Sequence, residues 1–235
     1  MKTIILCGGI GTRMKEETEF KPKPLVMVGD KPIIQHIMNI YSHFGFNEFI
    51  LTLGYKGKMI KEYFKNESHN FKIHLLDTGA ESLTGERVLR VAHLIREDNF
   101  MVTYGDGVAN IDINKLINFH KRQNTIGTIS GVHPYAKYGL IQKNSENLVT
   151  AFLQKPRMKE YVSGGFMVFK KEILRYLNKG NIEGVFPELI RQQQLSVYEH
   201  DGFWKAMDTV KEMEEMNELW RTTKPWDLSG KVKEI

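Results

Sequence analysis

Hydrophobic positions in the first half of the chain alternate between short continuous runs and repeats at helical spacing. Residues 2–6 form a β-branched run that stops at Gly8 and Gly9, which is typical of a buried parallel strand leading into a loop. In residues 33–44 the apolar side chains recur every three or four positions, with Gly45 placed to end the helix. The same reading predicts strands at 49–53, 71–76, 100–104 and 125–132, and helices at 56–64, 87–96 and 113–122.

Residues that favour turns are more closely spaced in the second half of the chain. Strands follow one another in residues 139–169, which suggests an antiparallel part that holds a substrate. Helical patterns return at 171–177, 186–193 and 210–220. Strands that alternate with helices predict an α/β fold with a mainly parallel, Rossmann-like sheet flanked by helices. No repeat or linker divides the chain, so we expect a single domain spanning residues 1–235.

Composition narrows the class of protein. The chain is 41% hydrophobic and 26% charged, close to the usual globular mixture, and it has no apolar run near the ~20 residues that span a bilayer. The single cysteine, Cys7, excludes an internal disulfide and a cysteine-based zinc site, so we expect a reducing, cytoplasmic location. The net charge of +5 comes from scattered residues and suits an anionic small ligand as well as nucleic acid.

A glycine-rich segment follows the first predicted strand. It reads Leu6-Cys7-Gly8-Gly9-Ile10-Gly11-Thr12-Arg13, and Lys23 comes ten residues later. Glycines after a strand let backbone N–H groups approach phosphate oxygens, and the two cations neutralise phosphate charge. The spacing matches neither a Walker A motif nor the Rossmann fingerprint. The segment is therefore typical of a polyphosphate loop, and the alternative is a glycine turn with basic surface residues.

Two aspartates are candidates for metal ligands. Asp106 lies between Gly105 and Gly107 at the carboxyl end of a predicted strand, where α/β sheets bind ligands, although Asp-Gly is also a common turn. Asp208 lies in Met207-Asp208-Thr209, just before a predicted helix, where it could equally be the N-cap.

These segments together resemble the sugar-phosphate nucleotidyltransferases, which make nucleoside-diphosphate sugars. The glycine loop and Lys23-Pro24 carry the family signature, and the chain most resembles the glucose-1-phosphate cytidylyltransferase branch. The resemblance runs almost end to end, and it includes Gly54-Tyr55-Lys56-Gly57, Asp77-Thr78-Gly79, Tyr104-Gly105-Asp106-Gly107 and His200-Asp201-Gly202-Phe203-Trp204.

The resemblance implies a reaction and a set of residues. A sugar-phosphate oxygen attacks the α-phosphorus of CTP, pyrophosphate leaves, and Mg²⁺ is held by Asp106 and Asp208. Arg13 would bind the β and γ phosphates, and Lys23 the reacting ones. The implied nucleotide-binding set is Leu6, Gly8, Gly9, Gly11, Thr12, Arg13, Lys23, Ser82, Thr84, Gly85, Arg87 and Gly105. A homo-oligomer and a role in cell-surface polysaccharide biosynthesis are also implied, with no nucleic-acid or membrane partner.

The phosphorylated acceptor is implied less completely. Family segments that hold it correspond to Gly139, Gln154, Lys155, Ser163 and Gly164, with Lys155 on the phosphate. The family usually has Glu at the position of Gln154 and commonly Asn at that of Ser163, so glucose 1-phosphate is expected to be a poor acceptor. A uridylyl or guanylyl specificity for another acceptor stays an alternative. A non-catalytic regulatory subunit is a second alternative, but a protein that only binds would be free to lose either aspartate.

Overall fold

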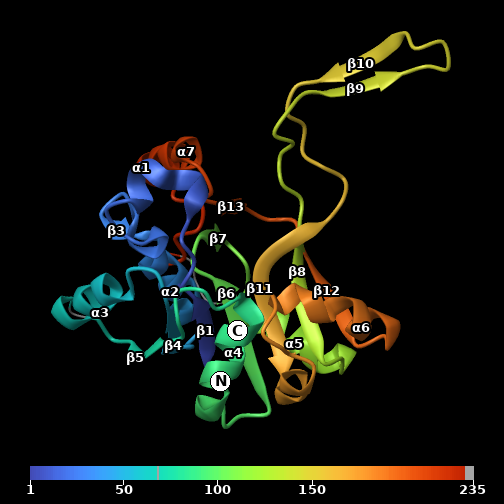
Figure 1. The fold of residues 1–235 in the computed structure, drawn as a ribbon. Coiled ribbons are helices and arrows are strands. Elements are labelled where there is room, and N and C mark those ends of the chain that lie inside the picture. Colours follow the sequence, from blue (N-terminus) through green and yellow to red (C-terminus); the bar gives the residue numbers. More distant parts are fainter. Residues whose placement is uncertain (68, 231–235) are drawn as a thin grey trace.

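The computed structural model describes residues 1–67 and 69–230, and within them the principal sheet has seven strands (Figure 1). In chain order these are β1 (Thr3–Leu6), β4 (Glu48–Leu53), β5 (Lys72–Asp77), β6 (Asn99–Tyr104), β8 (Gly127–Val132), β11 (Val162–Lys170) and β12 (Leu195–His200). Their spatial order is β12-β8-β11-β6-β1-β4-β5. Strand β11 runs antiparallel to both of its neighbours, and the other pairings are parallel. The predicted α/β class with a mainly parallel sheet is confirmed.

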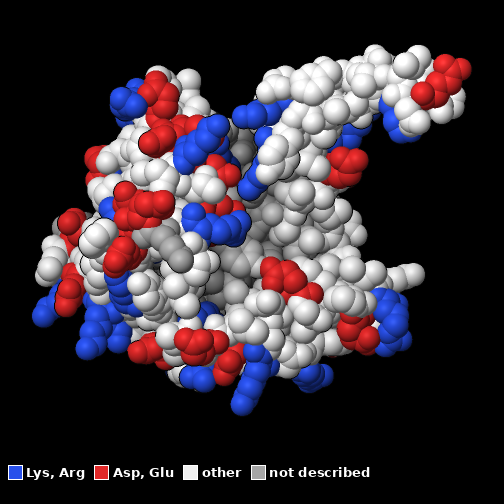
Figure 2. Space-filling model, turned by 45° about the horizontal axis from the view of Figure 1, so that its top comes forward, with Lys and Arg blue, Asp and Glu red and all other residues white. Residues whose placement is uncertain are grey.

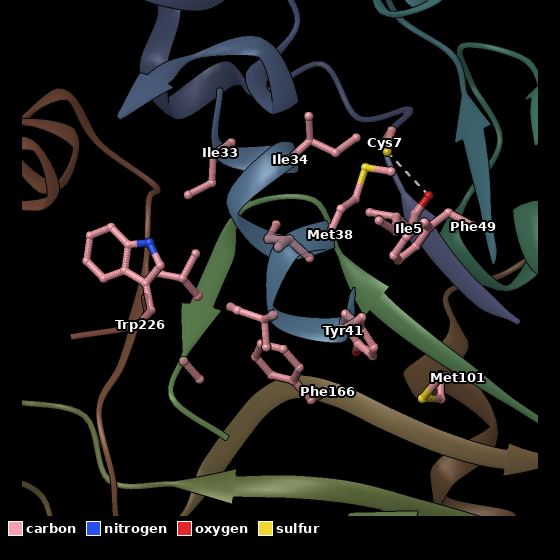
Figure 3. Packing of buried hydrophobic residues seen from close by; sticks show 14 of the residues in the cluster. Ile5, Cys7, Ile33, Ile34, Met38, Tyr41, Phe49, Met101, Phe166 and Trp226 are labelled. Atoms are coloured by element: carbon pink, nitrogen blue, oxygen red, sulfur yellow. Dashed lines mark hydrogen bonds between the residues drawn. The ribbon is translucent and has the colours of Figure 1, made fainter. Parts of the chain in front are cut away.

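Helices cover both faces of this sheet. On one face lie α2 (Ile33–His43), α3 (Gly57–Asn66), α5 (Ile113–Gln123) and α7 (Val210–Thr222), and on the other α4 (Thr84–Val91) and α6 (Phe186–Arg191). Residues of β1 alternate between the two cores, because Ile5 joins the first cluster while Ile4 and Leu6 join the second. Figure 3 shows α2 placing Met38 and Tyr41 against the sheet beside Phe166. This burial on both sides explains the continuous apolar run in β1.

Shorter elements complete the chain. The 3₁₀ turns are η1 (Thr12–Met14), η2 (Lys23–Leu25), η3 (Ala92–Leu94), η4 (Lys171–Arg175) and η5 (Ile182–Val185), and α1 is Lys15–Thr18. Small antiparallel pairs form from β2 (Met27–Val28) with β3 (Lys31–Pro32), and from β7 (Gly107–Ala109) with β13 (Trp204–Ala206). None of the helices in the described ranges is long and apolar enough to cross a membrane.

Several sequence-based boundaries were wrong. The helix predicted at 87–96 begins at Thr84 and gives way to η3 after Val91, and residues 171–175 form a 3₁₀ turn rather than an α-helix. Strand β12 was missed because its burial is uneven, so that no clean alternation marks it. Strands β7 and β13, of three residues each, are too short for any periodic signal.

The predicted antiparallel part at 139–169 separates into two structures. Strand β11 lies inside the principal sheet, since six successive residues of it, 164–169, are buried. Strands β9 (Leu140–Lys143) and β10 (Val149–Leu153) instead form a hairpin that stands away from the sheet (Figure 1). We call the whole segment between β8 and β11, residues 133–161, the arm.

Candidate active site

The strand order places a cleft at the carboxyl ends of β1 and β6. The helices that follow β1 and β4 cover one face, whereas α4, which leads from β5 to β6, covers the other. The order in which the chain adds strands therefore reverses between β1 and β6. Open α/β sheets bind ligands at such a switch point. A cavity of about 440 Å³ lies there, lined by the glycine loop, residues 80–84, Tyr104 to Asp106, and Asp208.

Glycines are required where the loop passes under α4. A Cβ on Gly8 would come within 1.9 Å of the Arg87 guanidinium, so a larger residue cannot fit without moving that side chain. Gly11 has φ of +71°, a left-handed conformation that L side chains rarely adopt. After this turn the chain enters η1, which carries Arg13 at the edge of the cavity.

Four charged side chains meet at the cavity from four separate segments. Lys23 Nζ, on η2, donates to Asp106 Oδ2 at 2.7 Å and to Asp208 Oδ1 at 2.8 Å. Arg13 contacts both oxygens of Asp208 at 2.9 Å, although 67% of its side chain is exposed. Asp106 follows β6, and Asp208 follows β13. The predicted residues Arg13, Lys23, Asp106 and Asp208 are therefore neighbours in space.

The cluster favours charged forms in spite of burial. Burial acts to lower the pKa of Lys23, but the two aspartates outweigh it and raise that pKa above the ordinary lysine value. Burial likewise opposes ionisation of Asp208, yet Lys23, Arg13 and Lys137 hold its pKa below the usual range. Two cations and two anions balance, so the four side chains carry no net charge.

Asp208 does not serve as the N-cap of the helix after it. Thr209 occupies the N-cap position of α7, where its hydroxyl accepts a hydrogen bond from the Glu212 backbone N–H at 3.2 Å. Glu212 in turn accepts from the Asp208 backbone N–H at 2.8 Å. This capping leaves the Asp208 carboxylate pointing to Lys23 and Arg13.

The loop after β5 is held by a buried arginine. The Arg87 guanidinium donates to Gly8 O, Leu53 O, Thr78 Oγ1 and Ala80 O at 2.7 to 3.1 Å. It thereby joins the glycine loop, the end of β4 and the loop at 78–80, and burial lowers its pKa. Arg87 lines the cavity, so its predicted nucleotide contact stays a prediction, but in this structure its donors are engaged by the protein.

The other predicted nucleotide-binding residues are divided. Leu6, Gly8, Gly9, Gly11, Thr12, Ser82, Thr84 and Gly105 line the cavity, but Gly85 does not. Gly85 is buried on α4, where a Cβ would lie 2.8 Å from Gly180 O. The Ser82 and Thr84 hydroxyls are bonded within the protein, to Thr78 O and to Asn181 Oδ1.

The predicted acceptor residues lie outside the cavity lining. Gly139, Gln154 and Lys155 are in the arm, and the last two are exposed. Ser163 and Gly164 are at the start of β11, and the Gly164 carbonyl accepts from Trp204 Nε1 at 2.8 Å. The structure therefore does not bring this set to the four charges, and its role stays a prediction.

Some neighbours of the site gave no sequence signal. Lys137, in the arm, lies 3.8 Å from Glu212 and contributes to the lowered pKa of Asp208. Asn181 and Tyr104 line the cavity, and Tyr104 contacts Glu183 of η5. Lys137 and Asn181 belong to no motif, and Tyr104 belongs to one but was not expected at the site, so only the folded chain places the three residues here.

The donor set is suited to a hard cation. The ammonium group of Lys23 lies between the carboxylates of Asp106 and Asp208 and donates to both, so a positive charge already occupies the space between them. Mg²⁺ is usually held by one or two carboxylates, with water and substrate phosphates as its other ligands. The described residues contain no cluster of three or more potential metal-ligating side chains, and Asp106 and Asp208 stay the candidate pair among them.

Comparison with known proteins identifies the class. A nucleotidyl transferase family model matches residues 2–222, and the chain belongs to that family. More particularly, it is 39% identical to a Bacillus subtilis (strain 168) protein named probable glucose-1-phosphate cytidylyltransferase, with 94% of this chain and 96% of that protein covered. Glucose-1-phosphate cytidylyltransferase of Salmonella typhimurium is 37% identical, with 96% and 98% covered. The predicted family and enzyme class, nucleotidyltransferase, are confirmed.

A solved structure supports the fold. The crystal structure of HddC from Yersinia pseudotuberculosis superposes with a TM-score of 0.71 at 22% identity, covering 93% of this chain and 99% of that one.

Proposed function

We propose that this protein is a cytidylyltransferase that joins CTP to a sugar 1-phosphate and releases pyrophosphate. The observation that carries the proposal is the meeting of Asp106 and Asp208 on Lys23, beside the glycine loop. Such paired carboxylates suit Mg²⁺ bound together with triphosphate oxygens. The similarity to two named glucose-1-phosphate cytidylyltransferases supports CTP as the nucleotide and a sugar phosphate as the acceptor. Cytoplasmic location and a part in cell-surface polysaccharide synthesis belong to the same proposal.

The chain's own residues bring two anions together. The attacking phosphate oxygen is already negative, so no general base is needed, and the main barrier is repulsion between sugar phosphate and triphosphate. Backbone N–H groups of the glycine loop would face the triphosphate, with Arg13 on its outer phosphates. Lys23 would turn from the aspartates to the reacting phosphates. Mg²⁺, when bound by Asp106 and Asp208, would supply further positive charge where negative charge accumulates.

The base would be read in the part of the cavity beneath α4. Residues 80–84 line it opposite the glycine loop, and Arg87 fixes both segments relative to each other. Backbone groups in rigid positions discriminate bases by their hydrogen-bonding edges, and the glycine loop and residues 80–84 would supply such groups. We assign CTP because the sequence of this segment follows the cytidylyltransferase pattern.

The acceptor would approach from the arm. Lys155 and Lys137 lie on this side. The charge of Lys137 acts to lower the pKa of Asp208, and that of Lys155 acts to lower the pKa of Glu215 in α7. Gln154 and Ser163 replace the Glu and Asn usual in the family, and each unmatched polar group costs about 1–3 kcal/mol. We therefore expect glucose 1-phosphate to be used poorly, by a factor of about 10² or more.

The test is pyrophosphate release from four nucleoside triphosphates, each with a panel of sugar 1-phosphates and other phosphorylated metabolites. Release with CTP and at least one sugar 1-phosphate is expected, and the Asp208→Asn variant is the matched inactive control. Preference for another triphosphate would overturn the cytidylyl assignment. For the acceptor, Gln154→Glu combined with Ser163→Asn should raise kcat/KM for glucose 1-phosphate. Efficient use of that sugar by the unmodified protein, at roughly 10⁴ M⁻¹s⁻¹ or above, would contradict our interpretation of the two substitutions.

A further inference from the structure

The main chain at Asp208 is fixed by hydrogen bonds from two successive N–H groups. The Met207 N–H donates to the Asp106 carbonyl at 2.9 Å, which joins the main chains of the two candidate metal ligands. The Asp208 N–H donates to Glu212 Oε2 at 2.8 Å. The first bond is made between backbone groups, whereas the second depends on the side chain of Glu212.

The contact between Glu212 and Asp208 departs from ordinary helix capping. In a capping box the acidic residue at the third helical position accepts from the N–H of the N-cap residue. Thr209 is the N-cap of α7 and Glu212 is at that third position, but its carboxylate reaches one residue further back, to Asp208. Glu212 therefore acts on the segment that carries the candidate ligand and not only on the start of the helix.

The second carboxylate oxygen of Glu212 faces the arm. Lys137 Nζ lies 3.8 Å from Glu212 Oε1, and 66% of the lysine side chain is exposed. Figure 2 shows Lys and Arg side chains gathered on the side of the arm's base that faces the body. An exposed ion pair of this kind adds little to stability, because water and salt screen it. Its effect is instead to favour one placement of the arm relative to Asp208.

We propose that Glu212 is a positioning residue for nucleotidyl transfer, which holds the Asp208 main chain through one oxygen and the base of the arm through the other. The inference rests on the proposed function, in which Asp208 binds the metal and the acceptor approaches from the arm. The acceptor phosphate has to face the α-phosphorus, and a displacement of about 1 Å costs about 100-fold in rate. One carboxylate that contacts both sides keeps the acceptor side and Asp208 in register.

Steady-state kinetics with CTP and the sugar 1-phosphate that the wild-type protein uses best separates the two contacts. Glu212→Ala removes both and should lower kcat about 10- to 100-fold. Glu212→Gln keeps an oxygen that can accept from the Asp208 N–H but loses the charge that faces Lys137. It should therefore recover most of kcat and, like Lys137→Met, raise KM for the acceptor about 3- to 10-fold with KM for CTP unchanged. The two changes combined should raise this KM no further than either alone.

Two control variants exclude a general effect on α7. Glu218→Gln alters an acid further along the same helix, which pairs with Arg221 at 2.6 Å, and should change neither kcat nor KM. Thr209→Ala removes the N-cap hydroxyl and should lower the urea midpoint as Glu212→Ala does, while kcat stays within about 3-fold of wild type. A Glu212→Ala variant with wild-type kcat, or with a loss no larger than that of Thr209→Ala, would overturn the proposal.

Hydrogen exchange of the Asp208 amide gives a readout that needs no substrate. Exchange should be at least about 10-fold faster in Glu212→Ala than in wild type and near the wild-type rate in Glu212→Gln. Equal rates in all three proteins would overturn the proposal. If Glu212→Ala does not fold, Glu212→Ser takes its place with the same expectations. A wild-type protein that turns over no triphosphate overturns the proposed function, and the exchange rates then still decide whether Glu212 holds Asp208.

Discussion

Replacing Arg87 by alanine should loosen the floor of the cavity before any nucleotide binds. The guanidinium donates four hydrogen bonds, to Gly8 O, Leu53 O, Thr78 Oγ1 and Ala80 O. No carboxylate is among these partners, so the stabilisation comes from neutral acceptors and opposes the cost of burying a charge. Arg87→Ala removes the hydrogen bonds and the buried charge together. The loss of stability therefore depends on which acceptors keep another donor.

Some of the acceptors keep a donor in the variant. Gly8 O still accepts from the Tyr55 backbone N–H at 3.2 Å, and Leu53 O from the backbone N–H and hydroxyl of Thr78. Ala80 O and Thr78 Oγ1 lose the donor that Arg87 supplies. Ala80 is exposed, so its carbonyl can bond to water, whereas the Thr78 hydroxyl is buried and the hydrogen bond it loses is worth about 0.5–1.5 kcal/mol. The space left by the Arg87 side chain adds a cavity cost. We expect the free energy of unfolding to fall by about 2–4 kcal/mol.

Urea denaturation without nucleotide measures this loss, and steady-state kinetics measures KM for CTP. The control is Arg90→Ala, three residues along the same helix, because Arg90 is half exposed and bonds only Glu86. That control should change stability by less than about 0.5 kcal/mol. Arg87→Ala should raise KM as well, since both loops that we propose to face the triphosphate lose their anchor. An unfolding free energy equal to that of wild type, with only KM raised, would refute the bracing role and favour direct contact with the nucleotide.

Three further predictions concern the charged cluster and a buried histidine. Asp106→Asn and Asp208→Asn should each lower kcat at least about 100-fold with the fold retained, because each would remove one proposed metal ligand; wild-type turnover at saturating Mg²⁺ would contradict the assignment. Lys23→Ala should lower kcat more than it raises KM, whereas Arg13→Ala should weaken triphosphate binding and also slow turnover. Steady-state kinetics of both variants tests this, and a Lys23→Ala variant that changes KM alone would contradict its role in the chemical step. Burial, with a smaller effect from Lys170, lowers the pKa of His120 from 6.5 to about 4. The unfolded chain therefore takes up a proton first, so stability should fall by about 3 kcal/mol as pH drops from 6.5 to 4. His120→Gln should remove that share of the pH dependence in urea denaturation series, and an unchanged profile would disprove it.

The sequence predicted the parallel half of the sheet well because burial there is two-sided. Residues of β1 and β4 are buried on both faces, so each strand is a continuous apolar run bounded by glycine or polar residues. Strand β12 is half-exposed, and its pattern of intermediate residues has no clean period. The arm contains the predicted antiparallel strands, β9 and β10, and its role in holding a substrate stays a prediction. Its apolar residues are exposed, and sequence alone cannot tell an apolar residue of a core from one on a surface.

Candidate site residues were predictable where backbone geometry limits the choice of residue. Gly8 and Gly11 are required by a close approach and a left-handed turn, and the aspartates follow strand ends. Sequence alone could not distinguish Asp208 from a helix N-cap, because Thr209 next to it performs that task only in the folded chain. Nor could it find Lys137, whose place beside α7 depends on the path of the arm.

The wide spacing of the charged cluster has a consequence for the order of folding. Lys23 is 83 residues from one aspartate partner and 185 from the other. Asp208 precedes α7, and α7 is hydrogen-bonded to the first thirty residues. Asn217 accepts from the Gly29 backbone N–H, and Trp220 Nε1 donates to Asp30. Contacts so distant along the chain form late, and synthesis proceeds from the N-terminus. A nascent chain that has emerged as far as β12 would therefore hold the glycine loop and the first aspartate but lack the second. Activity should appear only once α7 has docked.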